Sequence, residues 1–301
     1  MSGMDRVKID NLKTESRNPK TMKLDSMSVM ELIRVMNEED QKVVDGVREA
    51  LPQIEKAIEF VVHALKNNGR LIYMGAGTSG RLGILDAVEC APTFSTRDEV
   101  IGIIAGGERA FVKAVEGAED SEELAAVDLD KVDVSERDVV AAIAASGRTP
   151  YAIGALKHAK SMKAGCIAIT CNKGSELAKY ADVAIEVDAG PEVLTGSTRL
   201  KAGTCQKVIL NMLSTASMVG IGKVYGNLMV DVKATNLKLV ERAKRIVMES
   251  TGCDIDTSAA TLELTDYNCK TAIVMILADV TKEEASRRII ENHGLIRNCI
   301  E

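Results

Sequence analysis

Five short apolar runs alternate with helical patterns between residues 70 and 220, and this alternation restricts the chain to few folds. The runs are Arg70–Gly75, Val100–Ala105, Val139–Ala145, Cys166–Thr170 and Val183–Val187. Short, continuously apolar runs of this kind are typical of strands buried in a parallel sheet. Strands that alternate with helices indicate βαβ units, and right-handed crossovers then place helices on both faces of the sheet. The sequence therefore predicts an α/β domain with three layers and a doubly wound, parallel, five-stranded sheet.

Helical patterns flank and connect these runs. Apolar residues recur at helical spacing from residue 26 to about residue 67, with Pro52 at a helix start or break. Further helices are expected over Pro150–Met162, Ser175–Tyr180 and, as a long helix, about Lys201–Val219. Four more short helices are expected near the C-terminus, over Val240–Ser250, Ser258–Thr265, Cys269–Ala278 and Lys282–Asn292.

These patterns divide the chain into three parts. Residues 1–57 are expected to form an irregular polar arm, up to about residue 24, followed by helices that contact a second subunit. Residues 58–235 form the α/β domain, and residues 236–301 form a small all-helical domain.

Composition excludes several classes of protein. Hydrophobic residues make up 46% of the chain, enough to bury a core and to exclude intrinsic disorder. The net charge of −6 and an aromatic content of 3% argue against binding to nucleic acid. The sequence has no secretory signal pattern and no apolar run of about 18 residues, so we expect a cytoplasmic protein without a membrane span. Seven cysteines without a C-x-x-C pair, and only three histidines, predict reduced thiols and no zinc site.

The first apolar run ends in a glycine-rich loop, Gly75–Leu82. It satisfies the dinucleotide-binding pattern G-x-G-x-x-G, but the acidic residue expected at the end of the second strand is displaced to Glu108. It nearly satisfies the phosphate-binding P-loop as well, although Arg81 and Leu82 replace the lysine and the magnesium-binding hydroxyl. What remains is an anion site made by backbone N–H groups at a helix start, together with the hydroxyls of Thr78 and Ser79.

Two more loops combine glycine, hydroxyl groups and an arginine. Ala145–Pro150 follows the third run, and Thr195–Arg199 follows the fifth. The carboxyl ends of parallel strands converge on the ligand crevice of such sheets, so three loops of this type predict a phosphate site. Ordinary helix capping by the hydroxyls, and solvation of the domain edge by the arginines, remain alternatives. The candidate phosphate-binding residues are Gly77, Thr78, Ser79, Arg81, Ser146, Arg148, Thr149, Ser197, Thr198, Arg199 and Lys201.

Longer motifs connect these loops to a known family. Met74–Phe94 closely resembles the signature of the N-acetylmuramic acid 6-phosphate etherases. The resemblance implies the sugar isomerase (SIS) fold, which binds phosphosugars, and a relation to the glucokinase regulatory protein, which binds phosphosugars without catalysis. Val88 and Ala91 depart from the expected pattern, but neither departure removes a charged group. The resemblance continues in Ala105–Glu108, Ala114–Asp120, Ala144–Tyr151, Thr195–Thr204, Gly226–Asn236 and Asn268–Ile273.

The resemblance implies a reaction and two catalytic residues. The family cleaves the C3 ether of its phosphorylated muramic sugar by eliminating D-lactate and then adding water, which requires a base and an acid but no cofactor. The resemblance assigns Glu89 as the proton donor and matches Glu119 to the family's second catalytic glutamate, to which we give the role of the base, although the sequence does not decide which of the two is the acid. It also implies a homodimer, and phosphosugar sites of this fold often include residues of the neighbouring subunit. The apolar neighbours Val88, Cys90 and Ala91 would keep Glu89 protonated. Glu119 lies in an acidic run that could simply be a solvated helix start, and Glu116 is the fallback base.

Three other functions remain open. A phosphosugar-binding regulator would have the same fold without turnover, and an aldose–ketose isomerase would share the abstraction of the C2 proton. A nicotinamide oxidoreductase ranks last, because only the glycine pattern supports it. Glu108 and Lys201 are further candidates for the site. For both residues, a position on the protein surface is an equally good interpretation.

Overall fold

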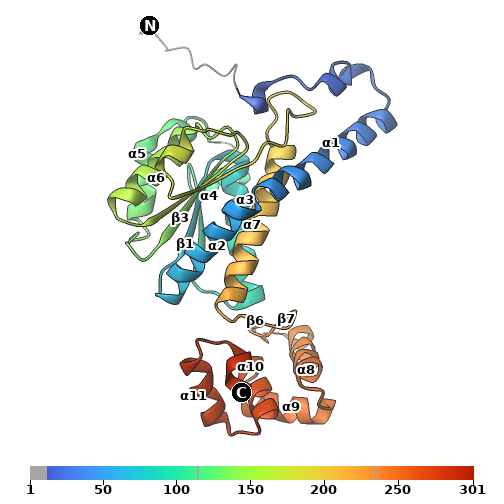
Figure 1. Ribbon diagram of the computed structural model, residues 1–301, viewed down its shortest axis with the longest axis vertical. Coiled ribbons are helices and arrows are strands. Elements are labelled where there is room, and N and C mark those ends of the chain that lie inside the picture. Colours follow the sequence, from blue (N-terminus) through green and yellow to red (C-terminus); the bar gives the residue numbers. More distant parts are fainter. Residues whose placement is uncertain (1–11, 114, 233, 235) are drawn as a thin grey trace.

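A five-stranded parallel sheet forms the centre of the computed structural model, which describes residues 12–113, 115–232, 234 and 236–301 (Figure 1). The strand order is β2-β1-β3-β4-β5, and all neighbouring strands are parallel. This confirms the predicted sheet and all five predicted strands. Their bounds are β1 (Leu71–Gly75), β2 (Val100–Ile104), β3 (Val139–Ala144), β4 (Gly165–Thr170) and β5 (Val183–Glu186).

Helices cover both faces of the sheet, as the alternating pattern predicted. One apolar core lies between the sheet and α2 (Leu51–Lys66), α3 (Gly77–Phe94) and α7 (Lys201–Gly220). α1 (Val29–Glu49) leads into α2 and packs against α7 (Figure 1). A second core lies on the opposite face, under α5 (Glu122–Asp130) and α6 (Pro150–Ser161). The chain runs from β1 to β2 on one side and then returns to place β3 on the other side of β1. The strand order therefore reverses between β1 and β3, where open α/β sheets bind their ligands.

Local chemistry explains where the N-terminal helices begin and end. A capping box starts α1, because the Ser28 hydroxyl accepts a hydrogen bond from the Glu31 N–H while the Glu31 carboxylate accepts one from the Ser28 N–H. Helix α1 ends at Ala50, and Pro52 occupies the first turn of α2 as predicted. The helix expected over residues 175–180 is only a short 3₁₀ helix, η5 (Leu177–Tyr180), and Ser175 lies before it, with its N–H donating to the Glu186 carboxylate.

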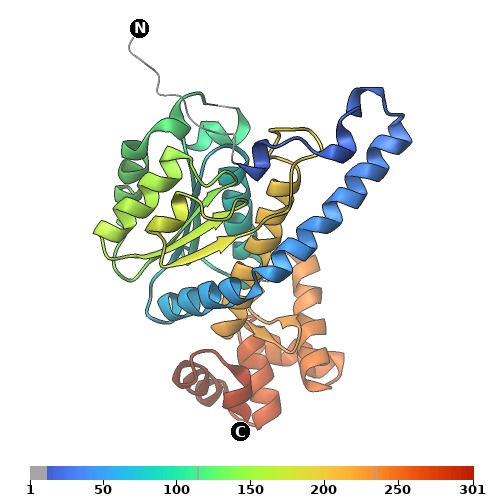
Figure 2. The same ribbon diagram turned by 45° about the horizontal axis from the view of Figure 1, so that its top comes forward.

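The N-terminal arm lies at the carboxyl ends of the strands, beside the start of α7 (Figure 2). It contains the 3₁₀ helices η1 (Lys13–Glu15), η2 (Pro19–Thr21) and η3 (Leu24–Ser26), while residues 1–11 of the predicted arm lie outside the described residues. Two short elements follow β2: α4 (Glu108–Val112) and the 3₁₀ helix η4 (Ala118–Asp120).

The C-terminal helices pack around an apolar core of their own. The sequence patterns missed the small β6–β7 hairpin (Val224–Tyr225 and Leu228–Met229), whose strands have two residues each. Val230 and Val232 belong to this C-terminal core, while the exact domain boundaries stay a prediction. Within the described ranges, no helix combines the length and the apolar character needed to cross a membrane. The helices are α8 (Leu237–Thr251), α9 (Ile255–Leu264), α10 (Cys269–Ala278), α11 (Lys282–Glu291) and α12 (Ile296–Ile300).

Gly80 allows α3 to approach the sheet. A β-carbon at this position would lie 2.5 Å from the Gly75 carbonyl oxygen and 2.7 Å from Cγ1 of Ile104. We expect Gly80→Ala to lower the free energy of unfolding by about 1–3 kcal/mol, because the clash with backbone outweighs the gain in helix propensity. Gly203→Ala is a matched control in α7, since a β-carbon there makes only ordinary contacts of 3.5 and 3.7 Å. Urea denaturation of both variants tests this expectation, and equal stabilities would contradict it.

Candidate active site

A cavity of about 380 Å³ opens at the carboxyl ends of β1 and β3, where the strand order reverses. The loop that begins α3 forms one wall, the loop that begins α6 forms another, and η4 and the arm complete it. Leu12, Glu15 and Asp120, which the sequence did not single out, also line it. Of the predicted site residues, it brings together Gly77, Thr78, Ser79, Glu119, Ser146, Arg148, Thr149 and Thr198.

The hydroxyl groups of these loops do not cap the helices that follow them. In α3, α6 and α7, the N-cap side chain makes no hydrogen bond to the first turn of the helix. Thr149 occupies the N-cap position of α6, yet its hydroxyl accepts no bond from the helix. The capping alternative therefore does not apply at these three helices, and the first-turn N–H groups of α3 and α6 lie beside the cavity as anion donors.

The Ser79 side chain is oriented by a hydrogen bond to Gln206, a residue that the sequence patterns did not identify. Its buried hydroxyl donates to Oε1 of Gln206 over 3.0 Å, which ties the first turn of α3 to α7. Ser79 also lines the cavity, so this bond orients a residue of the cavity wall.

The three predicted arginines lie in different surroundings. Arg148 lines the cavity. Arg81 instead donates to the carbonyl oxygens of Phe111 and Ala110, over 2.9 and 2.8 Å, and thereby holds the end of α4. Arg199 is exposed, and neither it nor Ser197 lies among the residues that line the cavity.

Lys201 is buried and does not line the cavity. Its ammonium nitrogen lies 2.9 Å from Oε2 of Glu39 and donates to the Ala189 carbonyl over 3.0 Å. The backbone N–H groups of Lys201 and Ala202 donate to the buried Glu192 carboxylate, each over 2.9 Å, and so fix the start of α7. Lys201 therefore positions the loop that ends at α7, and with it Thr198, which lines the cavity.

The charge on Glu39 makes the stability of this buried cluster depend on pH. Burial raises the pKa of the Glu39 carboxyl, but hydrogen bonds from Lys42, Lys201 and Asn18 together outweigh it and lower the pKa to about 2. A group with a lowered pKa in the folded state stabilises the fold above its unfolded pKa of about 4.5, and this stabilisation is lost as the pH falls through about 2.

We therefore expect Glu39→Gln to destabilise the protein at neutral pH, and the difference from the wild-type chain to shrink as the pH falls from about 4.5 towards 2. Denaturation of both proteins across this range measures the difference. If the difference in stability between the two proteins does not change with pH, the Glu39 charge contributes nothing to the stability of the fold.

The two predicted catalytic glutamates are not in one cavity of a single chain. Glu119 lies in η4, which follows Gly117, and it lines the cavity. Glu89 lies on α3, is exposed and does not line it. The expected apolar burial of Glu89 is wrong, because residues adjacent in a helix point to different sides: Cys90 is buried, whereas Val88 is 61% exposed. Glu108 and Glu116 are exposed and outside the cavity.

The fold, and the glycine–hydroxyl loops at its switch point, define a SIS-domain protein. Residues 53–160 match the family model "Glucokinase regulatory protein N-terminal SIS domain", and residues 113–216 match the SIS domain model. The chain is 56% identical over 295 residues to N-acetylmuramic acid 6-phosphate etherase 2 of Enterococcus faecalis, covering 98% of this chain and 100% of that protein. It is 57% identical over 290 residues to the N-acetylmuramic acid 6-phosphate etherase of Mycolicibacterium smegmatis, covering 96% and 97%. The chain belongs to the N-acetylmuramic acid 6-phosphate etherase family.

A solved structure supports the fold. A phosphoheptose isomerase from Francisella tularensis matches with a TM-score of 0.51 and 19% identity, covering 64% of this chain and 100% of that chain. This likeness concerns the SIS fold alone, because the sequences have diverged far.

Proposed function

We propose that this protein is a carbon–oxygen lyase that cleaves the D-lactyl ether of N-acetylmuramic acid 6-phosphate. Its products are N-acetylglucosamine 6-phosphate and D-lactate, so it serves the recycling of cell-wall amino sugars. The observation that carries the proposal is the single cavity in which Glu119 faces two anion-binding loops, on a chain that matches the etherases over nearly its full length.

The cavity has groups for each part of such a substrate. N–H groups at the starts of α3 and α6, the hydroxyls of Thr78 and Thr149, and the Arg148 guanidinium suit the 6-phosphate. Glu119 is a carboxylate at the cavity wall, where it can accept a proton from a bound sugar.

The chemistry follows from the open-chain sugar. Its C1 aldehyde acidifies the C2 proton, which the Glu119 carboxylate removes. The electron pair then forms the C2–C3 double bond as the C3–O bond breaks, and a protonated acid gives its proton to the departing lactate. Water adds its oxygen to C3 while a proton returns to C2, so the net reaction is hydrolysis without any change in oxidation state.

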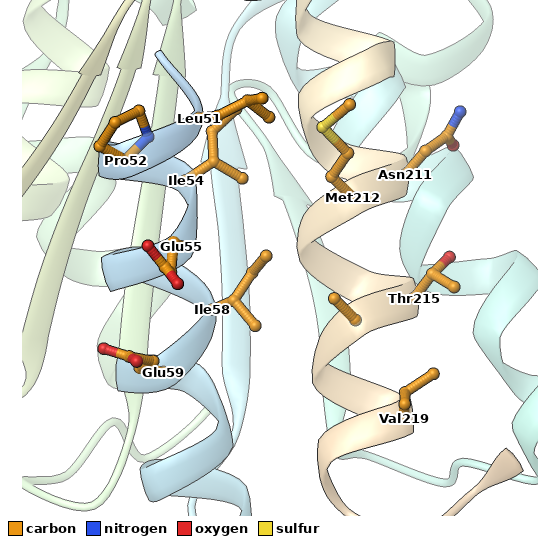
Figure 3. Close-up of a pocket in the computed structure, with 11 residues that line it drawn as sticks. Leu51, Pro52, Ile54, Glu55, Ile58, Glu59, Asn211, Met212, Thr215 and Val219 are labelled. Atoms are coloured by element: carbon orange, nitrogen blue, oxygen red, sulfur yellow. The ribbon is translucent and has the colours of Figure 1, made fainter. Parts of the chain in front are cut away.

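We also propose a homodimer in which Glu89 acts as this acid at the partner's cavity. Leu85, Val88 and Glu89 lie on one face of α3, and Leu85 and Val88 are 40% and 61% exposed. An apolar groove of about 980 Å³ runs nearby between α2 and α7, where Ile54 and Ile58 face Met212 and Val219 (Figure 3). α3 packs against α7, which forms one wall of the groove, and we propose that the groove and the exposed face of α3 together form the dimer surface. A second copy that covers this surface would take Glu89 out of water.

A cytoplasmic location agrees with the cysteine chemistry. All seven cysteines are free thiols, and six of them are buried. Burial raises the pKa of the Cys90 and Cys166 thiols to about 12, which keeps them unreactive.

An assay of the purified protein with N-acetylmuramic acid 6-phosphate tests the proposed reaction. Release of D-lactate at a rate proportional to enzyme concentration is the expected result. Tight binding of the sugar phosphate without lactate would indicate a regulator, and interconversion of aldose and ketose 6-phosphates would indicate an isomerase.

A further inference from the structure

The arm carries a third carboxylate to the cavity. Glu15, in η1, lines the same space as Glu119, Thr78 and Thr198. Its Oε2 lies 3.5 Å from where a β-carbon of Gly196 would be, so the carboxylate lies against the loop that precedes α7. Among the described residues, no hydrogen bond or ion pair to the Glu15 side chain is present, which leaves its oxygens free to accept from a ligand.

Two buried contacts fix the arm on either side of Glu15. On one side, the Lys13 N–H donates to Oδ1 of Asn172 over 2.9 Å, and Nδ2 of Asn172 donates to the Thr14 hydroxyl and to the Ala145 carbonyl over 3.2 and 3.0 Å. Asn172 is only 4% exposed and follows β4, so it joins the arm to the carboxyl ends of β3 and β4.

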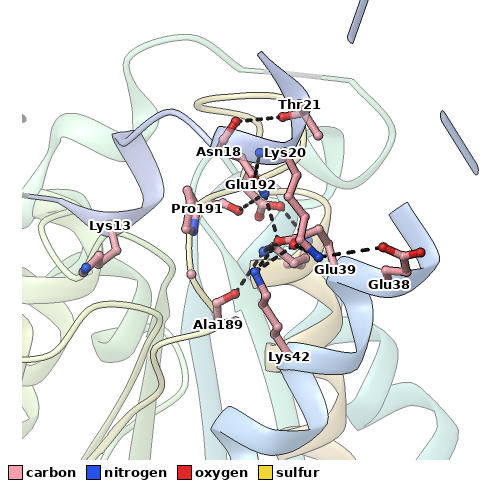
Figure 4. Close-up of polar contacts among 12 residues, drawn as sticks. Lys13, Asn18, Lys20, Thr21, Glu38, Glu39, Lys42, Ala189, Pro191 and Glu192 are labelled. Carbon is pink, nitrogen blue, oxygen red and sulfur yellow. Dashed lines mark hydrogen bonds and ion pairs between the residues drawn. The ribbon is translucent and has the colours of Figure 1, made fainter. Parts of the chain in front are cut away.

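On the other side, Asn18 anchors the arm to the buried ion pair beneath the site (Figure 4). Its side-chain amide donates to Oε2 of Glu39 over 2.8 Å and to the Pro191 carbonyl over 3.2 Å, and Asn18 is 2% exposed. An arm held at both Thr14 and Asn18 keeps Glu15 in one place. Such a preorganised carboxylate at a cavity wall binds a ligand without an added entropic cost of ordering.

We infer that Glu15 is a substrate-binding and specificity-determining residue, whose carboxylate accepts hydrogen bonds from hydroxyl groups of the bound phosphosugar. The inference rests on the proposed function, because it takes a phosphosugar as the ligand. A carboxylate repels the phosphate, whereas the N–H groups and Arg148 attract it. Glu15 and these donors therefore discriminate between the hydroxyl-bearing part and the anionic part of the sugar.

Glu15→Gln tests this role, because it removes the charge while keeping the size of the side chain. Hydrogen bonds to a charged acceptor are the strong ones, so we expect the affinity for N-acetylglucosamine 6-phosphate, measured by calorimetry, to fall about tenfold or more. The KM for N-acetylmuramic acid 6-phosphate rises by the same factor, while kcat stays within about threefold, because the contact is made equally in the ground state and the transition state.

Asp25→Asn is the matched control, since Asp25 is an exposed carboxylate of the same arm that does not line the cavity. It should leave KM, affinity and melting temperature unchanged. Unchanged affinity and KM in Glu15→Gln would overturn the inference, and so would a lower melting temperature without a change in KM. If the wild-type protein binds the sugar phosphate but releases no lactate, the proposed reaction fails while the calorimetric test of Glu15 still decides the inference. If it binds no phosphosugar, both fail together.

Discussion

We expect Glu119→Gln to lower the rate of D-lactate release by about 10²–10⁴-fold, the usual contribution of a general base. The amide keeps the shape of the side chain but cannot take the C2 proton. Glu119 is exposed in a 3₁₀ turn, and within the described ranges its side chain makes no hydrogen bond or ion pair, so its replacement should leave the fold intact. The loss is therefore expected in kcat, while the affinity for N-acetylglucosamine 6-phosphate changes little.

Glu116→Gln is the informative control for this prediction. Glu116 belongs to the same acidic run and is likewise exposed, but it does not line the cavity. Lactate release measured with a coupled D-lactate dehydrogenase assay should remain near the wild-type rate for Glu116→Gln. If Glu116→Gln were the inactive variant and Glu119→Gln the active one, the base would be assigned to the wrong residue of the run.

Local patterns in the sequence were sufficient to predict the sheet. Buried parallel strands such as Val139–Ala144 are continuous apolar runs, and Pro52 marks a helix start by its own backbone restriction. The glycine loops at the strand ends could also be predicted from the sequence, because close contact with the preceding strand requires glycine at position 80. Those loops led to Thr78, Ser146, Thr149 and Arg148, all of which line the cavity.

Residues whose positions depend on long-range contacts could not be assigned in this way. Lys201 has the same local surroundings as a ligand-binding lysine, yet its partner Glu39 lies 162 positions away. The arm lacks periodicity, so nothing local indicates that Asn172 draws Glu15 into the cavity wall. The sequence neighbours of Glu89 suggested burial because a linear string does not show which neighbours share its side of a helix.

The separation of Glu89 from Glu119 leads to the second prediction, which concerns a mixed dimer. A dimer with Glu89→Gln in one subunit and Glu119→Gln in the other should release lactate at about half the wild-type rate, although each variant alone is inactive. If each site takes Glu89 from one subunit and Glu119 from the other, both substitutions fall in the same site. The second site then keeps both native glutamates.

Coexpression with two different affinity tags and purification over both columns gives the mixed dimer, and lactate release measures its activity. A mixed dimer of wild-type and Glu119→Gln subunits controls for the purification, since it keeps one intact site under either arrangement. If both glutamates of a site came from one chain, the double-variant dimer would have no intact site and would be inactive. Activity in this dimer therefore requires that α3 of one subunit supplies its exposed carboxylate to the cavity of the other, which gives a physical reason for an acidic side chain on an apolar helix face.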